Sequence, residues 1–278
     1  MMTPSKIFDY DQWNRRLGSL KKEYARGEPY PHVLFSGLLE PAAVREVVRE
    51  FPGPTDIEWI QYKHFNENKL GKSKRDEFPP FIGRVVDELN SPRFLGFLEK
   101  LTGIPGLLAD PRLDGGGMHQ SGRGGFLNIH ADFTRNHYQP WRRRLNLILY
   151  LNEGWKESWG GSLELWDKDM KRCVKKVAPR MNHAILFNTD EDSYHGFPER
   201  LLCPEGVSRK SLALYYYTPM LDSDAKPRST NYRARPADGW KAPLIWLDKK
   251  AVYLYSALKS RFKLSDDWTK IIRFWGGS

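Results

Sequence analysis

The chain has 278 residues, of which 40% are hydrophobic, 28% charged and 13% aromatic. This balance is typical of a globular protein with a sizeable core, and it excludes a largely disordered chain. Lys and Arg number 44 against 34 Asp and Glu, which gives a formal net charge of +10. Because the basic residues are spread among acidic and apolar neighbours, they favour a solvated surface, and no nucleic-acid partner is expected.

Cysteine content and targeting signals give two further exclusions. Cys173 and Cys203 lie far apart without a CxxC motif, so a cysteine-rich zinc site is excluded and a disulfide framework is not indicated. Residues 1–17 contain no apolar signal region, and no apolar run in the chain reaches the length of a membrane span. We therefore expect a soluble protein of the reducing cytoplasm.

Residues 1–110 are predicted to form a mostly helical part that packs on the rest of the chain. Segments 11–27 and 39–53 have apolar residues at helical spacing, and the second begins near Pro41 and ends at Pro-Gly. Segment 78–104 predicts two more helices, separated at "NSP". The sequence "PYPHVLFSGLL" (29–39) predicts a short strand between the first two helices.

From residue 111 to about residue 220 the apolar period falls to two. In "RRRLNLILYLN" (142–152) the leucines occupy one face of a strand, and Asn146, Ile148 and Tyr150 occupy the other. Segments 160–167, 183–189 and 211–219 predict further strands. Short strands with Gly-rich turns and no helices between them predict an antiparallel sandwich or jelly roll.

Residues 221–278 are predicted to form a C-terminal loop and helical extension. They begin with a polar, Pro-containing segment, and residues 244–275 return to helical spacing, with Ser265 as a candidate N-cap. We expect this extension to pack on the sandwich, so that all three parts form one compact domain. Contact of the basic helix with nucleic acid or membrane is less favoured, because no RNA-binding motif accompanies it.

A pair of histidines and one aspartate stand out as candidate metal ligands. The segment "FLNIHADF" (126–133) places His130 and Asp132 at positions i and i+2 of a strand, where both side chains point to one face. His195, in "DSYHGF", supplies a distant second imidazole. Two imidazoles and a carboxylate on one face of an octahedron suit ferrous iron in oxygen chemistry. Among 7 histidines, however, this spacing also arises easily by chance.

Neighbouring segments add a candidate anion site. Arg209 begins an otherwise apolar and aromatic strand, "RKSLALYYYTP" (209–219). An arginine that faces the interior of a barrel is costly unless a carboxylate or phosphate meets it. Tyr150 lies on the polar face of another strand, where its hydroxyl could share the same anion. Together an arginine and a tyrosine suit a dicarboxylate.

Five motifs in order carry a family resemblance: "HAD", "LILYLNEGW", "WGGSLELW", "LFNTDEDSYHGFP" and "SRKSLALYYYTP". They resemble the iron(II)/2-oxoglutarate-dependent oxygenase superfamily, in its prolyl-hydroxylase-like branch. The resemblance covers residues 112–219, and "PYPHVLFSGLLEPAAVREVVREFP" (29–52) is similar to the N-terminal entry of that branch. It implies an α+β, mainly β fold: a double-stranded β-helix (jelly roll, cupin-like) at 111–220 as the catalytic core, with N-terminal helices (1–110) packed on it and a C-terminal helical extension (221–278).

The resemblance also implies roles for individual residues. The iron ligands and catalytic residues would be His130, Asp132 and His195. An aspartate at 132 speaks against the related halogenases, which have Ala or Gly at this position. Some members of the branch have Lys in place of Arg209, but strand alternation sends Lys210 to the opposite face. The residues for 2-oxoglutarate would be Arg209, Tyr150, Ser211, Asn146 and Gln120.

The implied reaction couples decarboxylation of 2-oxoglutarate, to succinate and CO2, with O2-dependent hydroxylation of a substrate C–H bond. The implied cofactors are Fe(II), 2-oxoglutarate and O2, with ascorbate admitted as a reductant. The substrate is open between a prolyl or other peptidyl residue, an amino acid, and a sugar or natural-product intermediate. Candidate substrate contacts in the basic segment after the ligands are Arg135, His137 and Arg142, although a solvated loop is the favoured explanation of this segment.

Two alternatives to this enzyme stay open at the level of the sequence. A jelly-roll ligand-binding module with a residual metal site would use Arg209 in a buried salt bridge, with Glu164 or Asp190 as the counter-charge. A cupin-like hydrolase or isomerase with another metal is less favoured, because the chain lacks a second cluster of histidines on strands. The oligomeric state is not indicated.

Overall fold

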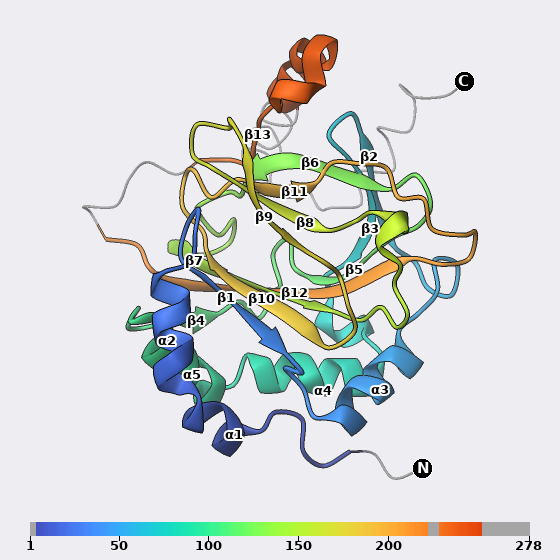
Figure 1. The fold of residues 1–278 in the computed structure, drawn as a ribbon. Helices are drawn as coiled ribbons and strands as arrows, with labels where there is room; N and C mark the ends of the chain where they lie inside the picture. Colours follow the sequence, from blue (N-terminus) through green and yellow to red (C-terminus); the bar gives the residue numbers. More distant parts are fainter. Residues whose placement is uncertain (1–3, 222–227, 252–278) are drawn as a thin grey trace.

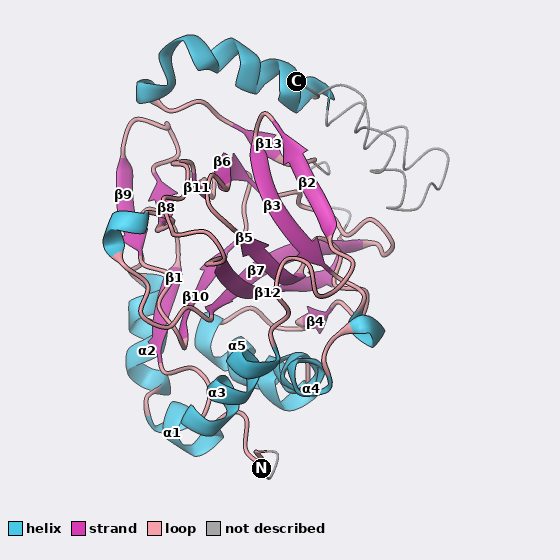
Figure 2. Ribbon diagram, turned by 90° about the vertical axis from the view of Figure 1, so that its right-hand side faces the viewer, coloured by secondary structure: helices cyan, strands magenta, loops and turns pink. Residues whose placement is uncertain are grey.

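The computed structural model describes residues 4–221 and 228–251. Its centre is a curled antiparallel sheet, and one layer of helices covers one side of it (Figures 1 and 2). The helices of this layer are α1 (Tyr10–Arg15), α2 (Leu17–Ala25), α3 (Pro41–Glu50), α4 (Pro80–Leu89) and α5 (Pro92–Thr102).

The strands hydrogen-bond in the order β1-β10-β7-β12-β5-β3-β6-β11-β8-β9, and β13, β2 and β4 attach to β6, β3 and β12. This curled sheet with helices around it confirms the predicted jelly-roll fold. The strand bounds are β1 His32–Ser36, β2 Ile60–His64, β3 Glu67–Lys72, β4 Leu108–Ala109, β5 Gly117–Ser121, β6 Phe126–Ala131, β7 Trp141–Tyr150, β8 Leu163–Trp166, β9 Cys173–Val177, β10 His183–Asn188, β11 His195–Phe197, β12 Arg209–Pro219 and β13 Asn231–Tyr232.

Strand alternation separates the two faces of the central strands. The leucines of β7 and β12 join the core between the sheet and the helices, together with Leu186 of β10. The opposite face of these strands points into the barrel and carries Tyr150, which packs with Ile185 and Phe187. The helices thus support the sheet from outside, and the polar residues that the sequence places on the second face line the interior.

A hairpin of β2 and β3 occupies a part of the chain that the sequence predicted to be mostly helical. It pairs residues 60–64 with 67–72 in antiparallel register. β3 then joins the two halves of the barrel, because Leu70 pairs with β5 and Glu67 pairs with β6. The segment is rich in charged and amide side chains and has no Gly or Pro at its turn, so the usual hairpin signals are missing.

The C-terminal extension begins as predicted, with an irregular segment followed by a helix over residues 242–251. This helix lies at the end of the barrel remote from α1–α5 (Figure 1). The further helix with Ser265 as its N-cap lies outside the described residues. Cys173 and Cys203 are free, and no helix within the described part of the chain has the length and apolar character to span a bilayer.

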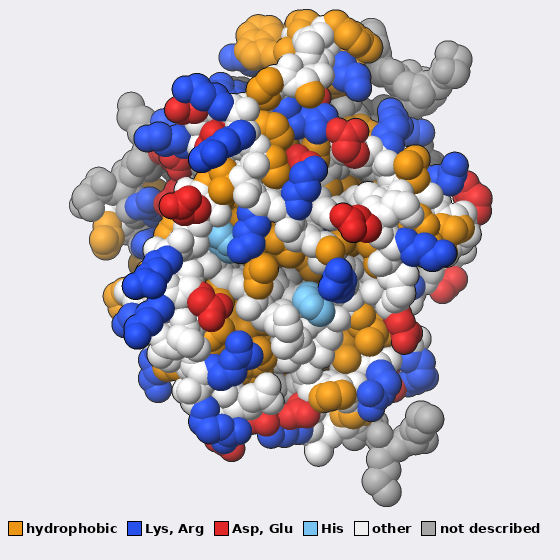
Figure 3. Space-filling view, viewed as in Figure 1, with side chains coloured by type: hydrophobic (Ala, Val, Ile, Leu, Met, Phe, Trp, Pro, Cys, Tyr) orange, Lys and Arg blue, Asp and Glu red, His pale blue; other side chains and the backbone are white. Residues whose placement is uncertain are grey.

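Basic and acidic side chains alternate over the face of the molecule shown in Figure 3. Lys and Arg do not gather there into one patch, which is the arrangement that the sequence predicts for a solvated surface.

Candidate metal centre

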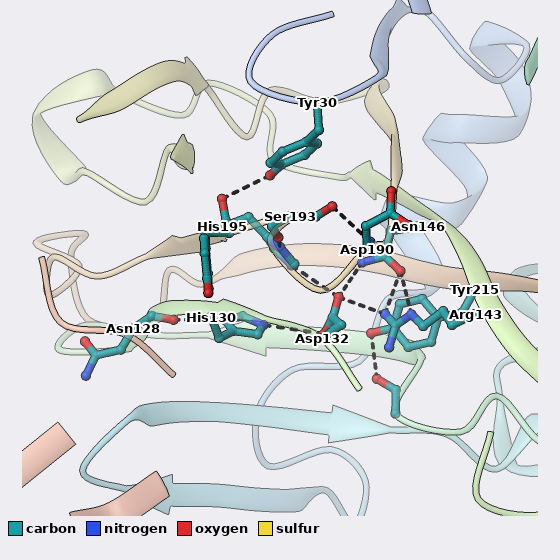
Figure 4. Close-up of polar contacts among 12 residues, drawn as sticks. Tyr30, Asn128, His130, Asp132, Arg143, Asn146, Asp190, Ser193, His195 and Tyr215 are labelled. Carbon is teal, nitrogen blue, oxygen red and sulfur yellow. Dashed lines mark hydrogen bonds and ion pairs between the residues drawn. The ribbon is translucent and has the colours of Figure 1, made fainter. Parts of the chain in front are cut away.

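Strand pairing brings the three predicted metal ligands together. β6 carries His130, Asp132 follows directly after it, and β11 begins at His195, which lies opposite His130 in the antiparallel pair. One ligand atom from each residue lies within 4.8 Å of the other two. His130 Nε2 is 3.5 Å from Asp132 Oδ1, and His195 Nε2 is 3.4 Å from Asp132 Oδ2. The three side chains converge on one point (Figure 4).

Backbone carbonyl groups set the orientation of both imidazoles. His130 Nδ1 lies 2.9 Å from the carbonyl oxygen of Asn128, and His195 Nδ1 lies 2.9 Å from that of Ser193. A carbonyl oxygen accepts only from a protonated Nδ1, so the neutral form of each imidazole carries its lone pair on Nε2. Burial lowers the pKa of His195 to about 4, and this imidazole is neutral at pH 7. Metal-binding histidines need this arrangement.

Asp132 is held by two side chains of β7. Asn146 Nδ2 donates to Asp132 Oδ2 at 2.7 Å, and Arg143 Nη2 donates to the same oxygen at 3.1 Å. Arg143 also donates to Asn146 Oδ1 from Nε, at 2.9 Å. Burial by itself would raise the pKa of Asp132, but Arg143 and the two imidazoles outweigh it and hold that pKa well below its ordinary value. The carboxylate is therefore ionised and fixed in orientation.

Arg143 is the residue of this network that the sequence did not identify. It is fully buried, and its guanidinium lies 3.3 Å from the centroid of the Tyr215 ring and 4.7 Å from that of Phe133. Strict alternation from Asn146 would send Arg144 inward. A bulge between β7 and β12 pairs Tyr216 with Leu145 and Tyr217 with Arg143, so Arg144 is the extra residue and Arg143 turns inward.

The structure also shows where the loop after the ligands ends. A solvated loop over the whole basic segment 133–144 would overlap the predicted strand at 142–152, and in the structure residues 141–144 begin β7. Arginines on an exposed strand end resemble those of a solvated loop in sequence, and only the register of β12 distinguishes them.

Replacing Arg143 with methionine is expected to destabilise the metal-free protein by about 3–5 kcal/mol, because it leaves the buried Asp132 carboxylate without its cation. The free energy of unfolding in urea measures the effect. Arg144→Met, at the neighbouring half-buried position, is the matched control, and the double variant with Asp132→Asn should recover much of the loss. Equal stability of the wild type and Arg143→Met would contradict the pairing.

A second polar site lies at the other end of the interior. Arg209 and Tyr150 are buried, with the guanidinium 4.9 Å from the centroid of the Tyr150 ring. Within the described residues, Arg209 forms no ion pair with a carboxylate, and the Tyr150 hydroxyl has no hydrogen-bond partner. Burial raises the pKa of Tyr150, and Arg209 offsets part of the rise. A buried cation and an unsatisfied hydroxyl together fit a carboxylate ligand.

The Trp-Gly-Gly turn holds Arg209 in place. Arg209 Nε donates to the carbonyl oxygen of Gly161 at 2.7 Å, which leaves the outer nitrogens for a ligand. Gly161 has φ +75°, and a Cβ at this position would lie 2.6 Å from Leu201 and 3.1 Å from Arg209. Only glycine allows this close approach. Neither Glu164 nor Asp190 pairs with Arg209: Glu164 pairs with Lys176, and Asp190 lies near Arg142.

The remaining residues predicted for the co-substrate divide into two groups. Ser211 is buried and follows Arg209 at i+2, so it shares the interior face. Gln120 lies opposite Lys210 on the other face and contacts the carbonyl oxygen of Pro52 and the hydroxyl of Ser208. The structure thus does not bring Gln120 to Arg209. Asn146 donates to Asp132 and accepts from Arg143, and its contact with the co-substrate stays a prediction.

The three candidate substrate residues lie at the surface. Arg135 and His137 are exposed, and Arg135 forms a β-bridge with Arg142. His137 Nδ1 lies 2.7 Å from Asp114 Oδ2, and Arg142 Nη2 lies 3.8 Å from Asp190 Oδ1. These contacts fix the segment after the metal ligands, and they do not by themselves distinguish a substrate contact from a stabilised loop.

Comparison with known proteins gives matches in sequence and in fold. Residues 116–217 match the family model of the 2OG-Fe(II) oxygenase superfamily. Prolyl 3-hydroxylase OGFOD1 from Mus musculus is 36% identical over 83 residues, which are 28% of this chain and 15% of that protein. The chain therefore spans a small part of this relative. The match over residues 116–217 confirms the resemblance of this segment to the 2-oxoglutarate-dependent oxygenases.

Solved structures with the same fold include prolyl hydroxylases. The Pseudomonas putida prolyl-4-hydroxylase has a TM-score of 0.52 at 18% identity, with 73% of this chain and 98% of that chain covered. The Phytophthora capsici prolyl 4-hydroxylase has a TM-score of 0.51 at 18% identity, with 97% and 80% covered. The prolyl hydroxylase of Trichoplax adhaerens, solved with a peptide fragment of hypoxia inducible factor, has a TM-score of 0.50 at 14% identity, with 75% and 93% covered. These likenesses establish the fold.

Proposed function

We propose that this protein is an Fe(II)- and 2-oxoglutarate-dependent dioxygenase that hydroxylates a substrate C–H bond, because residues 116–217 match the family model of the 2OG-Fe(II) oxygenase superfamily. His130, Asp132 and His195 would hold the iron, and Arg209 with Tyr150 would bind the distal carboxylate of 2-oxoglutarate. The proposal rests on two sites in the interior of the barrel: a His-Asp-His cluster, and a buried arginine that pairs with no carboxylate of the described residues.

Bound Fe(II) and 2-oxoglutarate would supply the oxidising chemistry: oxidative decarboxylation of 2-oxoglutarate by O2 to succinate and CO2, which places one oxygen atom in succinate and the other in the hydroxylated substrate. The chain supplies binding and orientation. Asn146 and Arg143 hold the Asp132 carboxylate, and Arg209 fixes the co-substrate at its far end. The apolar side chains of Ile185 and Phe187, which pack around Tyr150, exclude water between the two ends.

The test of this proposal is co-substrate turnover. Purified protein is incubated with Fe(II), 2-oxoglutarate and O2, with and without ascorbate, against libraries of peptides, amino acids and sugars. Succinate is measured, and mass spectrometry looks for a gain of one oxygen atom in the substrate. The alternative is a jelly-roll module that binds a ligand without turnover. No heat when 2-oxoglutarate is titrated into the anaerobic Fe(II)-loaded protein, and no competition by N-oxalylglycine, would favour that alternative.

Prolyl-containing polypeptides are the first substrates to test. The curated relative is named as a prolyl 3-hydroxylase, and one structural neighbour was solved with a peptide. A free amino acid and a sugar or natural-product intermediate are the other outcomes of the screen. A cytoplasmic location stays a prediction, supported by two free cysteines.

The basic segment after the ligands gives a prediction on substrate affinity. If Arg135 and Arg142 attract an anionic group of the substrate, charge reversal of both to glutamate should raise the KM for substrate about tenfold and leave kcat and the KM for 2-oxoglutarate unchanged. The double variant Lys168→Glu and Lys171→Glu, at two exposed positions, changes the net charge by the same amount and is the control. An unchanged KM for the substrate would mean that these arginines belong to the solvated surface and do not attract the substrate.

A further inference from the structure

The C-terminal strap, residues 228–251, forms the outer edge of the strand that leads to the metal ligands. The amide of Thr134 donates to the carbonyl oxygen of Arg228 at 3.0 Å, and the amide of Arg233 donates to that of Ile129 at 2.9 Å. Between them β13 pairs with the end of β6, with Tyr232 opposite His130. β3 covers only the beginning of this edge, so the strap completes it where the ligands lie (Figure 2).

Tyr232 packs directly against a metal ligand. Its ring centroid lies 5.4 Å from that of His130, with the two planes tilted by 40°. The Tyr232 side chain is buried and also meets the His64 ring edge-on at 6.1 Å. The contact therefore connects the imidazole of His130 to the hairpin of β2 and β3.

Asp248, on the helix of the strap, is held by two residues at the hairpin turn. Its Oδ2 accepts from Asn66 Nδ2 at 2.6 Å and from His64 Nδ1 at 2.7 Å. His64 Nε2 donates to Glu67 Oε1 at 2.8 Å. Burial by itself would lower the pKa of His64, but the hydrogen bonds to Asp248 and Glu67 raise it to about 9. At neutral pH a half-buried imidazolium thus bridges two carboxylates.

Asn66 provides a second connection from the strap to His130. Asn66 donates to the carbonyl oxygen of Ile245 at 3.2 Å, besides its bond to Asp248. Asn128 in turn donates to Asn66 Oδ1 at 3.0 Å from its side chain and to the Asn66 carbonyl at 2.8 Å from its backbone. The carbonyl oxygen of Asn128 is the group that orients His130 Nδ1. Two chains of contacts, through Tyr232 and through Asn66, therefore run from the strap to one ligand.

We propose that the C-terminal strap is part of the metal centre, and that Tyr232 and Asp248 are positioning residues that hold the His130 imidazole in the orientation for metal binding. The inference depends on one part of the proposed function, namely that the His-Asp-His cluster binds a divalent metal. Partners that orient ligands in this way change metal affinity by about 10–100-fold when they are lost. Binding of metal and docking of the strap must then favour one another.

The test uses Co(II) as the probe, with the whole 278-residue chain and without 2-oxoglutarate or substrate. Tyr232→Ala and Asp248→Ala should weaken Co(II) binding at least tenfold by calorimetry and change the visible absorption of the bound Co(II). Tyr232→Phe keeps the ring and should recover affinity and spectrum. Trp246→Ala, on the exposed side of the same helix with 54% accessibility, is the matched control and should behave as the wild type.

Wild-type Co(II) affinity and spectrum in Tyr232→Ala and Asp248→Ala would overturn the inference and leave the proposed function intact. Absence of Co(II) binding by the wild type would instead refute the metal site itself. Hydrogen exchange on the wild type keeps the inference testable if a variant does not fold. Co(II) should slow exchange of the amides in residues 231–248, and unchanged exchange there would contradict the coupling.

Discussion

Asp132→Ala is expected to abolish succinate formation in the presence of Fe(II) and 2-oxoglutarate, with a loss of at least about 1,000-fold. The substitution removes the only carboxylate of the His-Asp-His cluster found among the described residues, and two imidazoles alone do not complete the facial site that ferrous iron prefers. Succinate formation and Fe(II) affinity are measured on the same preparation, so that loss of metal and loss of turnover can be compared directly.

The control for this variant concerns folding. Asp132→Ala also leaves Arg143 buried without its carboxylate, which costs stability. Asp132→Asn keeps an oxygen that accepts from Asn146 and Arg143, and it should fold more stably than Asp132→Ala while it remains inactive. Turnover by a folded Asp132→Asn at the wild-type rate would show that this residue is not a metal ligand.

Arg209→Met is expected to weaken 2-oxoglutarate binding at least about 100-fold, since it removes two charge-assisted hydrogen bonds worth about 1.5 kcal/mol each. Calorimetric titration of 2-oxoglutarate into the anaerobic Fe(II)-loaded variant measures the loss. Fe(II) affinity should stay at the wild-type value. Within the described residues, Arg209 forms no hydrogen bond or ion pair with the His-Asp-His cluster.

Lys210→Met is the matched control, because it removes a cation from the next position of the same strand. Lys210 lies on the opposite face, with its ammonium group 5.5 Å from the centroid of the Phe51 ring, and the variant should bind 2-oxoglutarate as the wild type does. Arg209→Met should also melt at a higher temperature than the wild type without ligand, because a buried cation without a counter-ion costs free energy. Unchanged affinity in Arg209→Met would exclude this arginine from the co-substrate site.

The sequence by itself determined the fold class, the members of the His-Asp-His cluster and the buried arginine. Each of these depends on local order: strand alternation sets the inward faces of β7 and β12, and positions i and i+2 place His130 and Asp132 together. The motif order added His195, whose distance along the chain conceals its position opposite His130 in the sheet. The inward faces of the strands and the pair of His130 and Asp132 follow from the alternation of side chains within one strand, so they can be predicted from the sequence.

Only the tertiary structure decided what surrounds the ligands. Arg143 turns inward because of a bulge against β12, and a register shift between two strands has no signature in either one. The displacement of Gln120 from the co-substrate site follows from its pairing with Lys210. Tyr232 packs directly on His130, and Asp248 is connected to His130 through a hairpin that the sequence did not predict. Contacts between segments so far apart depend on how the strands associate, which local periodicity does not encode.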